Sequence, residues 1–141
     1  MSVTIETTKD IDACLAIRHD VFVREQGVPE DLERDAHDHT DAIHLIARDG
    51  ARVLGAARIL LKGDSAKIGR VCVAQAARGT GLGAGLIRAC LEEACRHDGI
   101  TRAVLGAQVS AIGFYEGLGF TAFGPVYDDA GIDHRDMDRA L

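Results

Sequence analysis

The run Arg78-Gly79-Thr80-Gly81-Leu82-Gly83 stands between an apolar run and a segment with helical spacing, and its composition suits phosphate binding. A glycine-rich turn that leads into a helix leaves backbone N–H groups free, and the helix dipole adds positive potential there. Together these effects form a cradle for phosphate. Glycine is needed because a side chain would hold the phosphate away from the backbone. The run therefore predicts a phosphorylated ligand.

Three kinds of protein build such a cradle. A P-loop ends in Gly-Lys-Ser/Thr, and this turn contains no lysine, so a P-loop is excluded. The dinucleotide-binding fingerprint fits Gly79, Gly81 and Ala84, but it requires an acidic residue at the end of the next strand. That strand is expected over 101–107 and leads into Gln108. A dinucleotide-dependent dehydrogenase is therefore the weaker interpretation.

The third kind of protein is favoured by a resemblance. Arg78, Gly81 and Gly83 match the Arg/Gln-x-x-Gly-x-Gly/Ala signature of the GNAT superfamily, which comprises acetyl-CoA-dependent N-acetyltransferases. Residues 108–120 resemble a second GNAT segment, N-x-x-A-x-x-F-Y-x-x-x-G-F, with Gln108 in place of Asn and five residues in register: Ala111, Phe114, Tyr115, Gly119 and Phe120. Both motifs occur in the family's order and spacing, so the chain is identified as a member.

Further segments resemble the ElaA-like branch of this superfamily, so that the likeness covers nearly the whole chain. These segments are residues 22–29, the acids Glu30, Glu33, Asp35 and Asp38 that follow them, His44-Leu45, residues 106–108 and residues 126–134. The branch usually carries Gly-Ile-Pro-His-x-x-Met, and here Asp133 replaces the proline while His134 and Met137 are kept. Loss of proline affects the rigidity of this loop more than the fold.

The resemblance implies where acetyl-CoA, the acetyl-donor substrate, binds. Backbone groups of the strand before the cradle hold the pantetheine arm and the thioester carbonyl, and the cradle amides hold the pyrophosphate. The donor-binding residues expected from this likeness are Val71, Cys72, Val73, Arg78, Gly79, Thr80, Gly81, Leu82, Gly83, Gln108, Ala111 and Phe114. Cys72 is expected to be a small buried residue, because the sequence shows no base beside it that would activate a thiol.

Catalysis requires an acid for the departing thiolate and a base for the amine. By resemblance, Tyr115 is the general acid. Glu25, His44 and His134 are three open alternatives for the base or for acceptor binding. The acids of 30–41 suggest a cationic amine or a peptide amine as acceptor. The histidines among these acids match no metal-site spacing, so no metal is expected.

Composition agrees with a single enzyme domain over residues 1–141. The length suits one core, and 47% apolar and 27% charged residues are ordinary globular values. The formal charge of −6 disfavours nucleic acid and anionic membranes as partners. Residues 1–10 predict no secretory signal. The four cysteines form no Cys-x-x-Cys pair, and free thiols indicate a cytoplasmic protein. A monomer or homodimer is expected.

Local patterns predict one α/β domain with the GNAT order of elements and no linker. The strands are expected over 3–6, 42–48, 52–61, up to 73, 101–107, 120–124 and 134–139, and the helices over 11–22, 84–97 and 109–118. Thr8 or Asp10 is the expected cap of the first helix. The fold class is therefore α/β, a mixed and mostly antiparallel twisted sheet flanked by helices, with the coenzyme A cradle between the fourth strand and the following helix.

These expectations predict an N-acetyltransferase that moves acetyl from acetyl-CoA to a primary amine by direct attack. The alternative is a GNAT-fold acyl-CoA-binding sensor or regulatory protein without turnover. The acceptor, a small molecule or a peptide, does not follow from the sequence.

Overall fold

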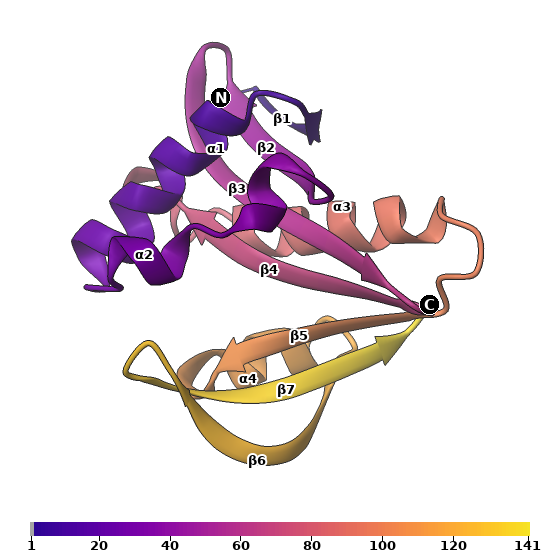
Figure 1. Ribbon diagram of the computed structural model, residues 1–141. Helices are drawn as coiled ribbons and strands as arrows, with labels where there is room; N and C mark the ends of the chain where they lie inside the picture. Colours follow the sequence, from indigo (N-terminus) through magenta and orange to yellow (C-terminus); the bar gives the residue numbers. More distant parts are fainter. Residues whose placement is uncertain (1) are drawn as a thin grey trace.

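The computed structural model describes residues 2–141, which form a single sheet with helices on both faces (Figure 1). The strands are β1 (Val3–Thr8), β2 (Ile43–Asp49), β3 (Arg52–Lys62), β4 (Ser65–Val73), β5 (Arg102–Gln108), β6 (Thr121–Asp129) and β7 (Ile132–Ala140). The helices are α1 (Ile11–Arg18), α2 (Glu30–Glu33), α3 (Leu82–Cys95) and α4 (Ile112–Glu116). A π-helical segment, η1 (His19–Glu25), continues α1, and three short 3₁₀ turns complete the chain: Ala36–His39, Gln75–Ala77 and Val109–Ala111.

The strand order in the sheet is β1-β2-β3-β4-β5-β7-β6. Every neighbouring pair is antiparallel except β4 and β5, which run parallel. Parallel neighbours need a crossover, and α3 provides it. The predicted α/β class with a mixed, mostly antiparallel sheet is confirmed.

The sheet opens between its two parallel strands. β4 pairs with β5 only from Ser65 opposite Arg102 to Lys67 opposite Val104. Beyond these pairs the strands diverge, so that β1–β4 form one arm and β5–β7 form the other (Figure 1). The carboxyl-terminal part of β4 therefore has an inner edge without a strand partner.

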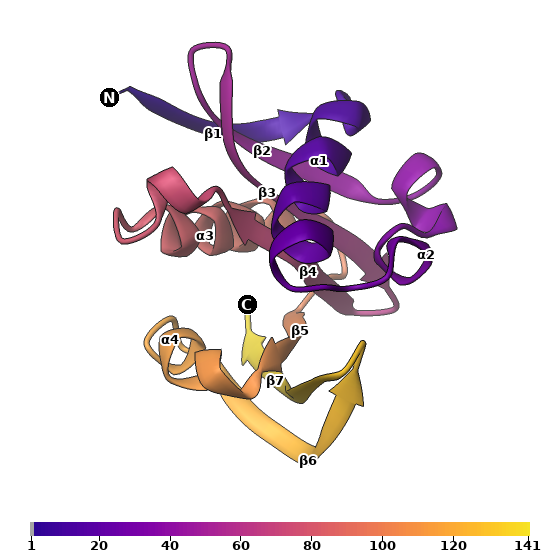
Figure 2. The ribbon, with the colours of Figure 1, turned by 90° about the vertical axis from the view of Figure 1, so that its left-hand side faces the viewer.

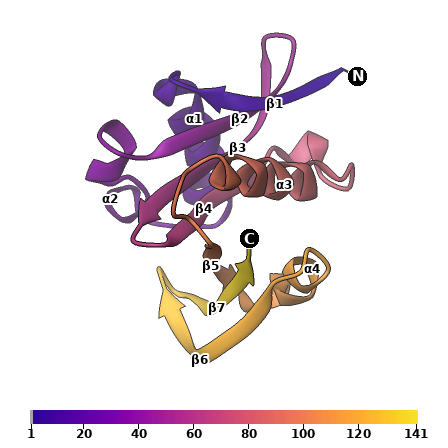
Figure 3. The same cartoon turned by 90° about the vertical axis from the view of Figure 1, so that its right-hand side faces the viewer.

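The two faces of the first arm carry different helices. α1 and α2 lie on one face and α3 lies on the other, whereas α4 packs against β5 and β6 of the second arm (Figures 2 and 3). Strand alternation separates the side chains accordingly: Leu45 and Ala47 pack in the core cluster with α3, whereas Ile46 packs with Cys14 and Ile17 of α1. The core on the α3 face extends to Phe120 and Met137 of the second arm.

The predicted helices were correct in position and differ in extent. Asp10 caps α1 by accepting a hydrogen bond from the Ala13 amide, as expected for one of the two candidates. The helix expected over 109–118 is shorter, because a 3₁₀ turn precedes α4 and Gly119 at φ +90° follows it. Of the helices in residues 2–141, none has the length and apolar character needed to cross a membrane.

The strand expected over 120–124 was predicted too short. β6 continues through Pro125 to Asp129. Proline lacks a backbone donor, but β6 is an edge strand, and its register against β7 shifts between Phe123 and Tyr127. Ala130 and Gly131, both at positive φ, then make the tight turn into β7. β7 accordingly begins at Ile132, two residues before the predicted start.

Candidate active site

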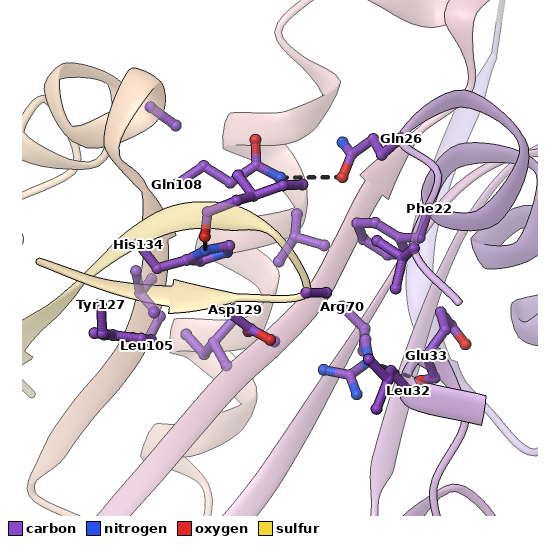
Figure 4. A pocket seen from close by; sticks show the side chains of 18 of the residues that line it. Phe22, Gln26, Leu32, Glu33, Arg70, Leu105, Gln108, Tyr127, Asp129 and His134 are labelled. Carbon is purple, nitrogen blue, oxygen red and sulfur yellow. Dashed lines mark hydrogen bonds between the residues drawn. The ribbon is translucent and has the colours of Figure 1, made fainter. Parts of the chain in front are cut away.

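A cavity of about 350 Å³ lies between the two arms where β4 and β5 diverge (Figure 4). Val71 of β4 forms part of one wall, Gln108 of β5 forms part of the other, and Tyr115 of α4 lines the same cavity. Gln108 donates a hydrogen bond of 3.1 Å from Nε2 to Oε1 of Gln26, at the end of η1. This bond joins the two arms across the cavity (Figure 4).

The cradle has the backbone geometry that phosphate binding requires. Gly79 and Gly81 have φ of +77° and +84°, which an L side chain rarely adopts. A Cβ built on either glycine would have no atom within 4 Å, so both face open space. Gly85 donates the first helical hydrogen bond, to the Gly81 carbonyl at 3.0 Å, which leaves the preceding amides of α3 available to a ligand. These features fit a pyrophosphate at this turn.

The structure brings several predicted donor-binding residues together. Val71 and Val73 lie on the unpaired inner edge of β4, where alternate N–H and C=O groups have no strand partner on the β5 side. Phe114 approaches the start of α3, because a Cβ on Gly83 would lie 3.6 Å from the tip of its ring. Cys72 faces α1 and is 3% exposed, and burial raises the pKa of its thiol to about 12. That thiol therefore stays protonated and is a poor nucleophile.

Arg78 and Glu25 form an ion pair beside the cradle. Nη2 of Arg78 lies 2.7 Å from Oε2 of Glu25, and Nε of Arg78 donates to the Val73 carbonyl at 3.1 Å. The pair thus connects the cradle to the end of η1. Glu25 is not among the residues that line the cavity. Its position supports a role in fixing Arg78 more than a role as the base.

Tyr115 lies at the cavity between two aromatic neighbours. Its ring meets those of Phe114 and Phe120 edge to face, at centroid distances of 5.0 and 6.0 Å. Burial, and to a lesser degree Cys90, raises the pKa of the phenol. The hydroxyl is therefore protonated at neutral pH, as a proton donor must be.

The two candidate histidines occupy different environments. His44 is 4% exposed, does not line the cavity, and has Nε2 within 2.9 Å of the Asp38 carbonyl. His134 lines the cavity (Figure 4), and its Nδ1 lies 2.8 Å from the Ile132 carbonyl. A carbonyl oxygen only accepts, so Nδ1 of His134 carries a proton. In the neutral ring, Nε2 then holds a free lone pair.

Three acids of the segment 30–41, Glu33, Asp35 and Asp38, are paired with arginines. Glu33 and Asp38 both bind Arg18, and Asp35 and Asp38 both bind Arg58, at distances between 2.5 and 3.1 Å. Burial alone would raise the pKa of Asp38, but hydrogen bonds from Arg18, the Asp35 amide and Arg58 hold it well below 3.8. These carboxylates are ionised and paired, and so they are not free to bind a cationic acceptor. Within residues 2–141, no group of three or more His, Cys, Asp and Glu side chains could hold a metal.

Sequence reasoning missed several residues of the cavity. Arg70 and Lys67 of β4 and Asp129 of β6 line it, and none had been assigned a role. Tyr127 also lines it, stacks on His134, and has its hydroxyl so close to Gly106 that a side chain there would require Tyr127 to shift. The signal for Arg70 was available, because a charged residue interrupts an apolar strand run.

Comparison with known proteins agrees with this geometry. Residues 6–141 match the family model described as an acetyltransferase (GNAT) domain. The chain is 36% identical over 134 residues to the protein ElaA of Escherichia coli strain K12, covering 92% of this chain and 86% of ElaA. It is 35% identical over 122 residues to the N-acetyltransferase YjcF of Bacillus subtilis strain 168, covering 86% of each chain.

Solved structures give the same result. The crystal structure of Escherichia coli ElaA superposes with a TM-score of 0.88 at 30% identity and covers 98% of this chain and 99% of ElaA. An acyl-CoA N-acyltransferase from Pseudomonas aeruginosa superposes with a TM-score of 0.86 at 34% identity and covers 99% of both chains. The chain therefore belongs to the GNAT acetyltransferase family, in a branch with ElaA, and is an acyltransferase that takes its acyl group from acyl-CoA.

Proposed function

We propose that the protein transfers acetyl from acetyl-CoA to a primary amine by direct attack. The observation that supports this most is the single cavity between the arms. It joins the unpaired edge of β4, where the thioester is expected, to Tyr115 on one element and His134 on another. All four cysteines are free, three of them buried, which favours a reducing compartment such as the cytoplasm.

Tyr115 is proposed as the general acid. As the amine nitrogen bonds to the acetyl carbon, the C–S bond breaks and the electron pair stays on sulfur. The phenol then donates its proton to the departing thiolate. The raised pKa of Tyr115 keeps that proton in place until the thiolate forms. The edge-to-face contacts with Phe114 and Phe120 hold the ring in position.

His134 is the candidate base that the geometry supports best. It lines the cavity, unlike Glu25 and His44. Its Nδ1–H donates to the Ile132 carbonyl, which fixes the ring and leaves Nε2 to accept the ammonium proton, directly or through water. Tyr127 stacks on the ring at a centroid distance of 6.0 Å and supports the same orientation.

The test combines binding with turnover. Acetyl-CoA should raise the melting temperature, because a ligand that binds only the native state stabilises it. A panel of amines, polyamines, amino acids and peptides should then include one that releases free coenzyme A thiol. Stabilisation by acetyl-CoA without thiol release from any member would favour the acyl-CoA sensor, and equal stabilisation by NAD would favour the dinucleotide interpretation.

The base is tested with the amine found in that panel. His134→Gln should lower turnover by about a hundredfold, within the usual range for loss of a general base. The loss should shrink at high pH, where the amine deprotonates without help. His97→Gln is the matched control, because His97 lies near the end of α3 against Glu93 and outside the cavity. Equal turnover in His134→Gln and His97→Gln would exclude His134 as the base.

A further inference from the structure

Arg70 stands at an irregular point of β4. The register between β3 and β4 shifts between Ala56 and Arg58, so β4 contains an extra residue there. Arg70 has φ of +52°, a left-handed conformation that an L residue other than glycine rarely adopts. Such strain in a residue other than glycine is concentrated at functional sites. The side chain at this position therefore needs an explanation beyond local folding.

The side chain of Arg70 extends toward α2 and the loop after it. Nε donates to the Glu33 carbonyl at 3.0 Å, and Nη2 lies 3.6 Å from Oδ2 of Asp35. Among residues 2–141, the bond from Nε is the one hydrogen bond that this side chain makes. The guanidinium lies at the cavity with its terminal nitrogens open to it (Figure 4).

The neighbouring charges leave Arg70 without a full partner. The carboxylates of Glu33 and Asp38 bind Arg18, and that of Asp35 binds Arg58 at 2.7 and 2.8 Å. Burial, then repulsion from Arg58 and Arg18, lowers the pKa of Arg70. Lys67, on the same strand as Arg70, is a second cation among the residues that line the cavity.

Apolar and polar residues line the cavity on both arms. Phe22, Val28 and Leu32 line it near Arg70, and Leu32 is 57% exposed. On the opposite arm, Asp129 and His134 line it. A molecule with an anionic end, an apolar body and an amine would thus meet a suitable group at each end.

We propose that the acceptor is a small amine that also bears a carboxylate, of the amino-acid class, and that Arg70 binds this carboxylate. The inference rests on the proposed acetyl transfer. It replaces the cationic acceptor expected from the acids of 30–41, because Glu33, which lines the cavity, and its neighbours Asp35 and Asp38 are held by Arg18 and Arg58. A guanidinium binds a carboxylate through two parallel hydrogen bonds, which fixes the acceptor's orientation as well as its affinity. A cavity of about 350 Å³ suits a small molecule better than a folded protein.

The experiment measures coenzyme A thiol release from acetyl-CoA with each common amino acid and with its carboxamide, in which a neutral group replaces the carboxylate. The two are compared at equal concentration of free amine, because the amide lowers the pKa of the α-amino group. For the productive acid, kcat/KM should exceed that of its amide by about tenfold or more. Arg70→Asn should lower kcat/KM for the acid by about ten- to hundredfold, mainly through KM, and leave the amide unchanged. Asparagine tolerates the left-handed backbone, so this variant should fold.

Two further variants separate the explanations. Arg34→Gln removes the same charge from a neighbouring exposed residue outside the cavity and should change nothing. Arg70→Lys keeps the charge without the planar fork and should give an intermediate KM, which also serves if Arg70→Asn does not fold. If kcat/KM for amides equalled that for acids, or if the Arg70 variants lost kcat/KM equally for both, Arg70 would be only structural. Either result would leave the proposal of acetyl transfer unaffected.

Failure of the proposed function gives a different result. If acetyl-CoA stabilises the protein but no amine releases thiol, acetyl transfer to these amines is excluded. Calorimetric titration of the same amino acids into the complex with coenzyme A then tests the site by itself. Binding that Arg70→Asn abolishes would support the carboxylate site, and absence of binding by every amino acid would overturn it.

Discussion

The donor side and the acceptor side of the cavity are assembled in different ways. The expected donor side comes mainly from one continuous stretch, residues 71–83, which presents mainly backbone groups, and Phe114 of α4 lies beside it. The acceptor side brings Arg18, Glu33, Asp38, Arg58 and Arg70 together from five separate elements, and presents charged side chains.

This difference teaches which changes each side can tolerate. Backbone groups at the donor side depend on φ angles that glycine permits, so nearly any side chain there is harmful. At the acceptor side the positive and negative charges balance one another. Removal of one charged side chain leaves its buried partner unpaired, and the desolvation of that partner then destabilises the fold. We therefore expect donor-side variants to lose binding and acceptor-side variants to lose stability or selectivity.

The largest effect is expected from Gly81→Glu. Gly81 has φ of +84° and faces open space. A glutamate there would strain the backbone, block its approach to phosphate and repel the negative charge. The increase in melting temperature caused by acetyl-CoA should disappear, and turnover should disappear with it.

Gly63→Glu is the matched control for Gly81→Glu. Gly63 also has a left-handed φ, +60°, and open surroundings, but it lies in the turn between β3 and β4 at the far end of these strands. It should suffer a similar strain and keep its response to acetyl-CoA. If both variants lost that response, strain alone would explain the Gly81 result.

The second effect concerns stability. Asp38→Asn breaks a buried cluster with Arg18 and Arg58 and should lower the free energy of unfolding at pH 7 by about 3–5 kcal/mol. Because the folded state depresses the pKa of Asp38, its stabilisation is present above pH 3.8 and is lost as pH falls through the folded pKa. Denaturant unfolding at a series of pH values measures both.

The control for Asp38→Asn is Asp31→Asn, an exposed acid in α2. Its effect should be within about 0.5 kcal/mol. Asp38→Asn should also lack part of the wild-type decline at low pH. A variant as stable as Asp31→Asn would mean that the cluster adds little to the fold, as some buried ion pairs do.

The third effect is on turnover. Tyr115→Phe removes one oxygen and should lower kcat by roughly a hundredfold if the hydroxyl is the general acid, with little change in acetyl-CoA affinity. Since the pKa of Tyr115 is raised above 10, wild-type turnover should decline only above about pH 10, as the phenol ionises. The variant should lack that decline, and a variant with wild-type kcat and the same decline would show that Tyr115 only packs.

The smallest effect is expected from Glu25→Gln. The ion pair with Arg78 is partly exposed, and such pairs contribute little to the free energy of unfolding. Stability should therefore change little, and the acceptor KM should change by less than about threefold. Any change should appear in KM for acetyl-CoA, because Arg78 is part of the cradle. A fall in turnover of tenfold or more at unchanged acetyl-CoA affinity would instead place Glu25 in the acceptor chemistry.

The sequence indicated local features well. Asp10 as a helix cap depends on neighbours within a few residues, and this cap is present in the structure. The phosphate cradle is local for the same reason. The GNAT fold followed from two motifs in the right order, which supplied long-range information that periodicity does not contain.

The acceptor side could not be predicted in this way. Arg18 lies in the apolar stripe of α1, and nothing near it in sequence shows that Glu33 and Asp38 pair with it. The loop acids consequently looked free. Arg70 depends on a bulge that follows from how β3 and β4 align, which a strand pattern does not encode. Ion pairing across the fold is the information that the sequence alone lacked.

The divergence of β4 and β5 also divides the chain at one point along its length. Everything in the first arm, including α1 and α3, precedes residue 96, and the second arm begins at Arg102. α3 packs on β1–β4, so the first arm can complete most of its contacts while the last forty or so residues are still being synthesised. The β5–β7 arm then docks through three residue pairs between β4 and β5 and through the shared core around Phe120 and Met137. We therefore expect the opening between β4 and β5 to coincide with a boundary between units of local unfolding.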